Sequence, residues 1–159
     1  MADVGIRRPV EFEAVFSRLK EFKIAKRFTE VIVLAAYVGF HYDRTASGPF
    51  QKPVEWQYFE NEEKSRLHML AIAHQKRLVN ENADCRIVSP EHQREMFQII
   101  EKYVHGGLLE MKDKGVFSQP DYAGYGNGLT TFLLNTLRKD EAEDEVRVQD
   151  LMRDLEQFK

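Results

Sequence analysis

The sequence predicts a mainly α-helical fold, a compact bundle of about five to six helices with at most a short extended segment. Apolar residues recur at spacings of three and four along much of the 159-residue chain, and Gly- and Pro-rich stretches separate the periodic segments. Hydrophobic residues make up 43% and charged residues 31%, which is ordinary for a folded domain and unlike a disordered chain.

The first half of the chain contains two predicted helices. Residues 10–22 carry the first, and the second runs from Glu30 to about Tyr42 behind a Thr29 cap. The second helix is apolar on nearly all sides, so it belongs in the middle of the domain. Residues 45–53 are expected to form a loop because of their Gly and Pro content, and residues 54–59 a short extended segment.

The second half contains at least three further helices. Asn61 caps a predicted helix that continues to about Val79, and Ser89-Pro90-Glu91 marks the start of another that carries an apolar stripe to Met111. Residues 119–128 are expected to be the most flexible stretch, followed by a short apolar helix over 129–137.

The C-terminal segment has a narrow apolar seam within a charged sequence. Four residues recur at spacings of three, four and three, namely Val148, Leu151, Leu155 and Phe158. This pattern is typical of a helix that docks on another helix. We therefore expect a helical globular domain over 1–140 and a charged helix over 141–159. That helix folds back on its own domain, pairs with a copy of itself or binds a larger partner.

Charge is distributed unevenly although the net charge is only −3. Residues 7–27 have a basic excess of four, whereas residues 138–159 have an acidic excess of three. A basic region of this kind can track phosphates, and the candidate DNA-binding residues are Arg18, Lys20, Lys23, Lys26 and Arg27. The alternative is that these residues solubilise the outer faces of the first helix and the turn after it.

The sequence contains no recognisable catalytic, cofactor or metal motif. Cys85 is the single cysteine, and His68 and His74 are six apart on one predicted helix, which puts them on different faces. Asp43 followed by Glu62-Glu63-Lys64 has the residue types of a metal-dependent nuclease. We predict that Asp43, Glu62 and Lys64 do not converge, and we expect no enzyme activity, cofactor or metal.

Two glycines, Gly106 and Gly107, lie inside the fourth long helix. Each costs about 1 kcal/mol relative to alanine in a helix interior. The cost is tolerable where another helix approaches the backbone closely, either within the domain or in a partner protein. Both glycines are therefore also candidate partner-binding residues.

Two stretches resemble a known family, the DNA phosphorothioation-associated protein 4 family. The first is the buried segment Val33–Phe40 with the downstream Tyr58-Phe59, and the second is Glu101–Leu109, which contains Tyr-x-x-Gly-Gly-Leu. The likeness covers about residues 22–137, and Val104 and His105 depart from the Ala and Asn that the family tends to have. The resemblance implies a gene neighbourhood for antiviral defence or restriction–modification, based on DNA phosphorothioation, and multi-subunit machinery that acts on DNA.

Three functional hypotheses follow. The first is a non-catalytic adaptor that contacts larger protein subunits of a DNA-acting defence complex. The second is DNA binding by the basic N-terminal region, and the third is a nuclease. No signal peptide is visible, and the longest apolar run, Val31–Val38, is too short to span a bilayer. We therefore expect a cytoplasmic protein without membrane contact, for which homo-oligomers are one possible assembly.

Overall fold

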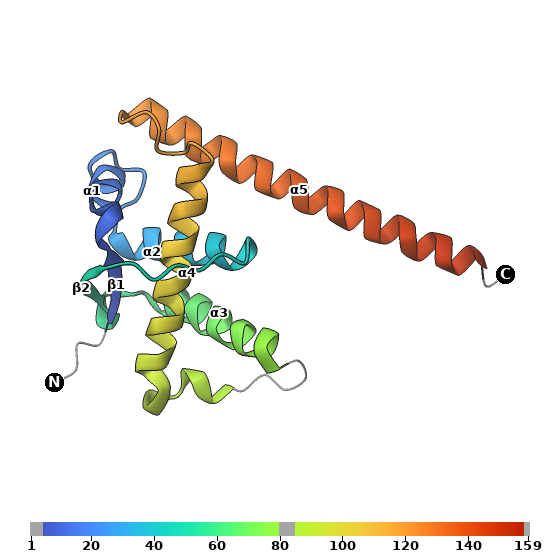
Figure 1. Cartoon of the computed structure of the whole chain (residues 1–159), viewed down its shortest axis with the longest axis horizontal. Helices are drawn as coiled ribbons and strands as arrows, with labels where there is room; N and C mark the ends of the chain where they lie inside the picture. The colour runs from blue at the N-terminus through green and yellow to red at the C-terminus, as the bar shows by residue number, and fades with distance from the viewer. Residues whose placement is uncertain (1–4, 80–84, 158–159) are drawn as a thin grey trace. The chain divides into compact units, whose positions relative to one another are not determined.

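A computed structural model describes residues 5–79 and 85–157. The elements in chain order are β1 (Gly5–Pro9), η1 (Val10–Phe12), α1 (Glu13–Glu21), α2 (Phe28–His41), β2 (Phe50–Glu55), η2 (Trp56–Tyr58), α3 (Asn61–Val79), η3 (Cys85–Val88), η4 (Pro90–His92), α4 (Gln93–Asp113) and α5 (Tyr122–Gln157), where η denotes a 3₁₀ helix. The predicted mainly α-helical class is confirmed (Figure 1). The chain divides into two compact units, residues 1–113 and 114–159.

Helices α2 and α4 cross at the centre of the first unit (Figure 1). Their backbones touch, because Gly39 on α2 and Gly107 on α4 carry no side chain at the crossing. A Cβ on Gly39 would clash with the carbonyl oxygen of Tyr103, and a Cβ on Gly107 with that of Ala35. The apolar α2 is buried on most sides, as its sequence predicts.

A two-stranded antiparallel sheet lies beside α4, and its first strand is absent from the sequence prediction. Ile6 of β1 is paired with Val54 of β2. The β1 backbone is attached to α4 by one side chain, since the Arg7 N–H donates to Glu101 Oε1 at 2.9 Å. β1 has two arginines and a proline in five residues, so it lacks the alternating pattern that identifies a half-buried strand.

The segment 44–48 crosses α4 on the way from α2 to β2. The Ala46 N–H donates to the Lys102 carbonyl at 3.1 Å, and the Gly48 N–H donates to His105 Nδ1 at 3.1 Å. Arg44 adds ion pairs to two carboxylates near the end of α4, Glu110 at 2.9 Å and Asp113 at 2.8 Å. Backbone N–H groups of this irregular segment thus find their hydrogen-bond acceptors on α4.

Several predicted boundaries were wrong. Residues 10–12 form a 3₁₀ turn, and α1 begins only at Glu13. Helix α2 begins at Phe28, so Thr29 lies buried inside it and is not its cap. The predicted loop over 45–53 ends early, because β2 starts at Phe50.

The predicted flexible stretch 119–128 is also largely helical. Asp121 precedes α5, and its Oδ1 accepts the Gly124 N–H at 2.6 Å, which satisfies a donor that the first turn leaves without a helical partner. Gly128 lies against the backbone of Val116, where a Cβ would collide. As a result, α5 is continuous from Tyr122 to Gln157 and includes both the short helix and the C-terminal segment that were predicted separately.

Candidate interaction surfaces

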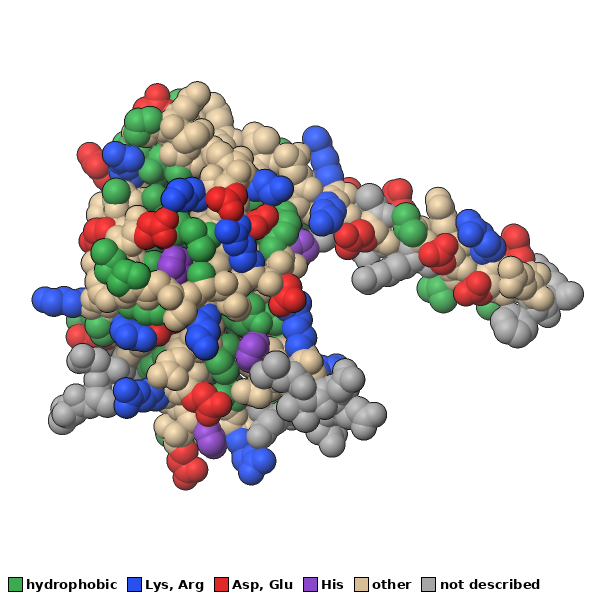
Figure 2. Space-filling model, viewed as in Figure 1, with side chains coloured by type: hydrophobic (Ala, Val, Ile, Leu, Met, Phe, Trp, Pro, Cys, Tyr) green, Lys and Arg blue, Asp and Glu red, His purple; other side chains and the backbone are tan. Residues whose placement is uncertain are grey.

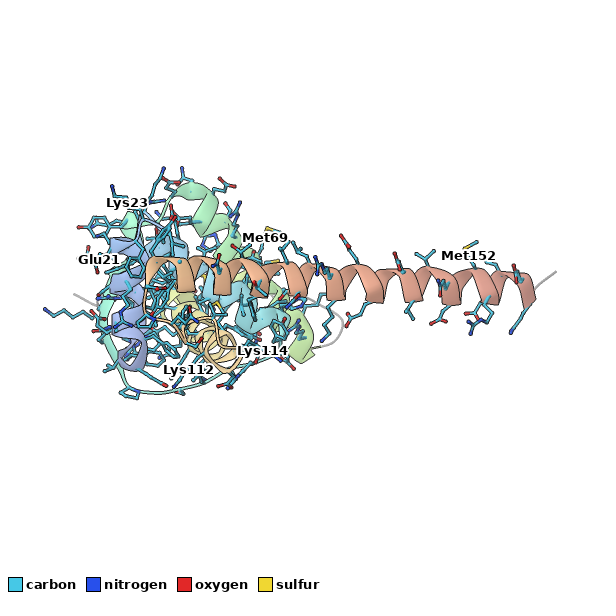
Figure 3. All side chains as sticks on the ribbon, turned by 90° about the horizontal axis from the view of Figure 1, so that it is seen from above. Glu21, Lys23, Met69, Lys112, Lys114 and Met152 are labelled. Atoms are coloured by element: carbon cyan, nitrogen blue, oxygen red, sulfur yellow. The ribbon has the colours of Figure 1, made fainter. Side chains whose placement is uncertain are left out.

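The C-terminal seam lies on α5 and is exposed. Val148, Leu151 and Leu155 have 54%, 63% and 67% of their surface accessible, and Phe158 lies outside the described residues. Met152, which neighbours the seam, projects from the helix in Figure 3. A helix of 36 residues is about 54 Å long at 1.5 Å per residue. The seam thus occupies one side of a long rod.

The continuity of α5 extends this seam beyond the residues found by sequence analysis. Leu134 and Leu137 have 47% and 59% of their surface exposed. Leu134 precedes Val148 by two heptads, and Leu137 precedes Leu151 by two heptads, so both pairs share a face of the helix. Sequence analysis assigned the two leucines to a separate short helix, and this is why the relation was missed.

Acidic side chains predominate around the seam. The exposed acids on the distal half of α5 are Glu141, Glu143, Glu145, Asp150, Asp154 and Glu156. Arg153 lies 4.0 Å from Asp150, an ion pair between exposed groups that contributes little to stability. This half of α5 therefore combines the apolar seam with a negative electrostatic potential.

Gly106 and Gly107 do not belong to an exposed surface. Both are buried, and a Cβ on Gly106 would clash with the carbonyl of Arg44. Gly107 contacts the backbone of α2 near Ala35 and Gly39. Close packing within the domain, the first of the two alternatives, accounts for both glycines.

The basic N-terminal residues are not equivalent in the structure. Arg27 Nη2 lies 2.9 Å from Glu63, 3.2 Å from Glu60 and 4.0 Å from Glu30, so its charge is neutralised by the chain's own carboxylates. Of the candidate DNA-binding residues, Arg27 is therefore already engaged in ion pairs within the chain.

The remaining basic candidates lie on α1 and the turn after it. Lys20, Lys23 and Lys26 are exposed, with the Lys20 ammonium 5.0 Å from the centre of the Phe28 ring, whereas Arg18 is only partly exposed. Lys23 lies at the edge of the molecule in Figure 3. On the face seen in Figure 2, Lys and Arg side chains are interspersed with Asp and Glu side chains and form no continuous basic patch.

The three candidate nuclease residues are separated, as predicted. Asp43 follows α2 and pairs with Arg77 of α3 at 3.6 Å. Glu62 and Lys64 lie at the opposite end of α3, and the rise of an α-helix puts Glu62 on the order of 22 Å from Arg77. Glu62 is instead bound to Arg66 at 2.6 Å. No group of three potential metal ligands was found among the residues that the structure describes.

Two partly buried histidine pairs were not identified from the sequence. His74 Nδ1 lies 2.7 Å from the hydroxyl of Tyr103, and burial lowers the pKa of His74 and raises that of Tyr103. His105 accepts from Gly48 at Nδ1 while its Nε2 lies 3.5 Å from Glu11. Since both ring nitrogens of His105 have partners within the chain, this histidine holds the 44–48 segment in place.

A shallow apolar groove of about 510 Å³ lies between α2 and α3. Its walls are Glu30, Val33, Leu34, Tyr37, Glu63, Arg66 and Met69. Tyr37 is fixed there, because its hydroxyl donates to the Arg66 carbonyl at 2.8 Å. Met69 lines the groove and is 65% exposed.

The structure thus defines a small, mainly α-helical protein with a long amphipathic helix. Within the residues that the structure describes, no helix is both long enough and apolar enough to cross a membrane. A family model described as DNA sulphur modification system-associated protein 4 matches residues 5–153, and the chain belongs to this family, as the resemblance in its sequence predicts. Neither a curated protein nor a solved structure matches the chain.

Proposed function

We propose that this protein is a non-catalytic adaptor of a bacterial DNA sulfur-modification system that acts in defence or restriction, and that α5 binds a larger subunit of that system. Membership of a family associated with such systems supports the setting. The exposed apolar seam of α5 is the observation that carries the adaptor role.

The size of the seam suits an assembly contact. Each large apolar side chain that leaves water contributes roughly 1.5–3 kcal/mol, so Val148, Leu151 and Leu155 together supply an amount comparable with the cost of association. Leu134 and Leu137 add to this where the partner extends along the helix. Five exposed large apolar side chains on one face of a helix are typical of a protein–protein contact.

Co-purification tests this role. The tagged full-length chain is co-expressed with the other subunits of its own system, as wild type and as the double variant Leu151→Asp/Leu155→Asp. We expect the double variant to lose its partner and to keep its circular dichroism spectrum and melting temperature. Removal of residues 144–159 should likewise abolish partner binding, with loss of only the helical signal of the deleted residues and an unchanged melting temperature.

Val146 provides the matched control. It is 55% exposed on the same helix but lies about 160° away from Val148, at 100° per residue. Val146→Asp should retain the partner. Retention of the partner by the double variant refutes the proposal. So does a deletion of residues 144–159 that lowers the melting temperature substantially while assembly is normal, because the helix is then part of the core.

DNA binding is a second candidate function, favoured by the exposure of Lys20, Lys23 and Lys26. Reversing all three to glutamate should abolish binding to duplex DNA without unfolding the protein. Each lost phosphate contact should also reduce the slope of log K against log salt by about 0.9.

A control triple carries the same change in charge at exposed lysines elsewhere, Lys52, Lys76 and Lys102. Binding that persists in the first triple, or that falls equally in both, would show that these lysines form no DNA site.

A further inference from the structure

The apolar row of α5 is interrupted by one charged residue. Leu134, Glu141, Val148 and Leu155 are each seven residues apart, so they follow one line along a helix that pairs in coiled-coil fashion. Glu141 therefore occupies a position that faces the partner. It is exposed in this structure and lies between apolar neighbours in the row.

A charge at this position determines which helices can pair with α5. A buried carboxylate without a cation is strongly unfavourable, and a buried ion pair is tolerated only with good geometry. A polar residue in such a row is the device by which coiled coils reject incorrect registers and partners. Glu141 thus requires a lysine or arginine opposite it.

A second copy of this chain does not provide that cation. The row of Glu141 also holds Leu134, Val148 and Leu155, and the second row of the seam consists of Leu137, Asp144 and Leu151. Neither row therefore contains a lysine or arginine between residues 134 and 155. In a parallel pair Glu141 faces its own copy, and in an antiparallel pair it faces the second row. Both arrangements leave its charge unpaired or repelled, so the seam disfavours self-association.

Two acidic residues flank the distal part of the seam, while Arg138 and Arg147 occupy other flanking positions in the sequence. Glu145 and Asp154 occupy heptad positions adjacent to the rows and are exposed. Facing residues at these positions interact across a helix pair and influence the choice of partner. Basic residues on the partner complement both of them.

From these positions we infer that α5 pairs with a helix of a different protein, one that has leucine-rich heptad rows, a lysine or arginine opposite Glu141 and basic residues opposite Glu145 and Asp154. This inference rests on the proposed adaptor function and specifies the chemistry of the partner helix. Glu141 is then a specificity-determining residue of the seam.

Two synthetic helices test the inference against the full-length chain. Each has four heptads with leucine in both rows and lysine on the flanks. They differ at one central row position, which is lysine in one peptide and glutamate in the other. Fluorescence anisotropy gives the Kd of each. We expect the lysine peptide to bind at least about tenfold more tightly, a factor that corresponds to a single favourable pairing.

Two variants of the chain complete the experiment. Glu141→Lys should reverse the preference between the peptides. Glu143→Lys makes the same change in charge at an exposed position outside the rows and should leave the preference unchanged. Equal binding of both peptides, or equal effects of the two variants, overturns the inference, because attraction is then a general property of the acidic helix. A wild-type homodimer in analytical ultracentrifugation that Leu151→Asp dissociates also overturns it.

The outcome is distinguishable from that of the adaptor test. Loss of the native partner in Leu151→Asp/Leu155→Asp, together with equal binding of the two peptides, supports the adaptor and refutes the role of Glu141. A clear peptide preference with unchanged native assembly supports the chemistry of the seam and refutes the adaptor.

Discussion

Replacing Gly107 by alanine probes the crossing of α2 and α4 directly. The new Cβ would collide with the carbonyl group of Ala35 and with the backbone nitrogen of Gly39. These are backbone atoms, so no side-chain rotation relieves the overlap. Restoring a normal carbon separation of about 3.5 Å requires the two helices to move apart by more than about 1 Å.

The expected loss of stability follows from two opposing terms. Alanine is favoured over glycine by about 1 kcal/mol in a helix interior. Overpacking a core costs about 1–3 kcal/mol even where side chains can adjust, and here a gap of about 1 Å between the helices forfeits up to half of the dispersion attraction across it. We expect Gly107→Ala to lower the free energy of unfolding by about 2 kcal/mol, which corresponds to a melting temperature lower by roughly 4–8 °C.

Urea unfolding followed by circular dichroism measures this change, and Gly126 supplies the control. Gly126 is helical, and a Cβ built there meets no atom within 4 Å, so Gly126→Ala should stabilise its helix by up to about 1 kcal/mol. The midpoint of Gly107→Ala should fall at an unchanged m-value. A Gly107→Ala protein as stable as the wild type would show that the two backbones are not in contact.

Two further predictions concern one buried and one partly buried polar group. Arg7→Ala leaves the buried Glu101 carboxylate without its guanidinium partner and should lower the free energy of unfolding by about 2 kcal/mol. This is below the usual cost of breaking a buried ion pair, because Arg7 is half exposed. An unchanged midpoint in urea unfolding contradicts the prediction. Burial lowers the pKa of His74, so the unfolded chain binds more protons and the free energy of unfolding should fall as the pH drops through about 6.5. His74→Gln should flatten this dependence between about pH 7.5 and 5.5, and an unaltered slope excludes His74 as the source.

The class of fold and most of the helices could be predicted because they depend on local patterns. Apolar periodicity located α2, α3 and α4, and the all-round apolar character of α2 predicted its burial. The repeat of Val148, Leu151 and Leu155 identified the seam for the same reason. These properties depend on residues three and four positions apart, and such spacings can be read directly from the sequence.

Long-range partners could not be predicted, since they join residues that are distant in sequence. β1 exists because β2 and Glu101 satisfy its backbone groups, and no pattern in five residues with two arginines indicates this. Likewise, only the position of three carboxylates around Arg27 shows that its charge is already engaged.

The sequence by itself determined the mainly helical class, the family and the presence of an amphipathic C-terminal segment, because composition and short periodic motifs carry that information. Only the tertiary structure decided how the glycines act and how far the seam extends. Gly106 packs against the 44–48 segment and Gly107 packs against α2, so both glycines make contacts inside the domain. Leu134 and Val148 lie on the same face because α5 is one continuous helix through the glycine-rich and charged stretches. The Asp121 cap and the contact of Gly128 with Val116 stabilise the helix across the glycine-rich stretch, where local propensity alone predicts a break.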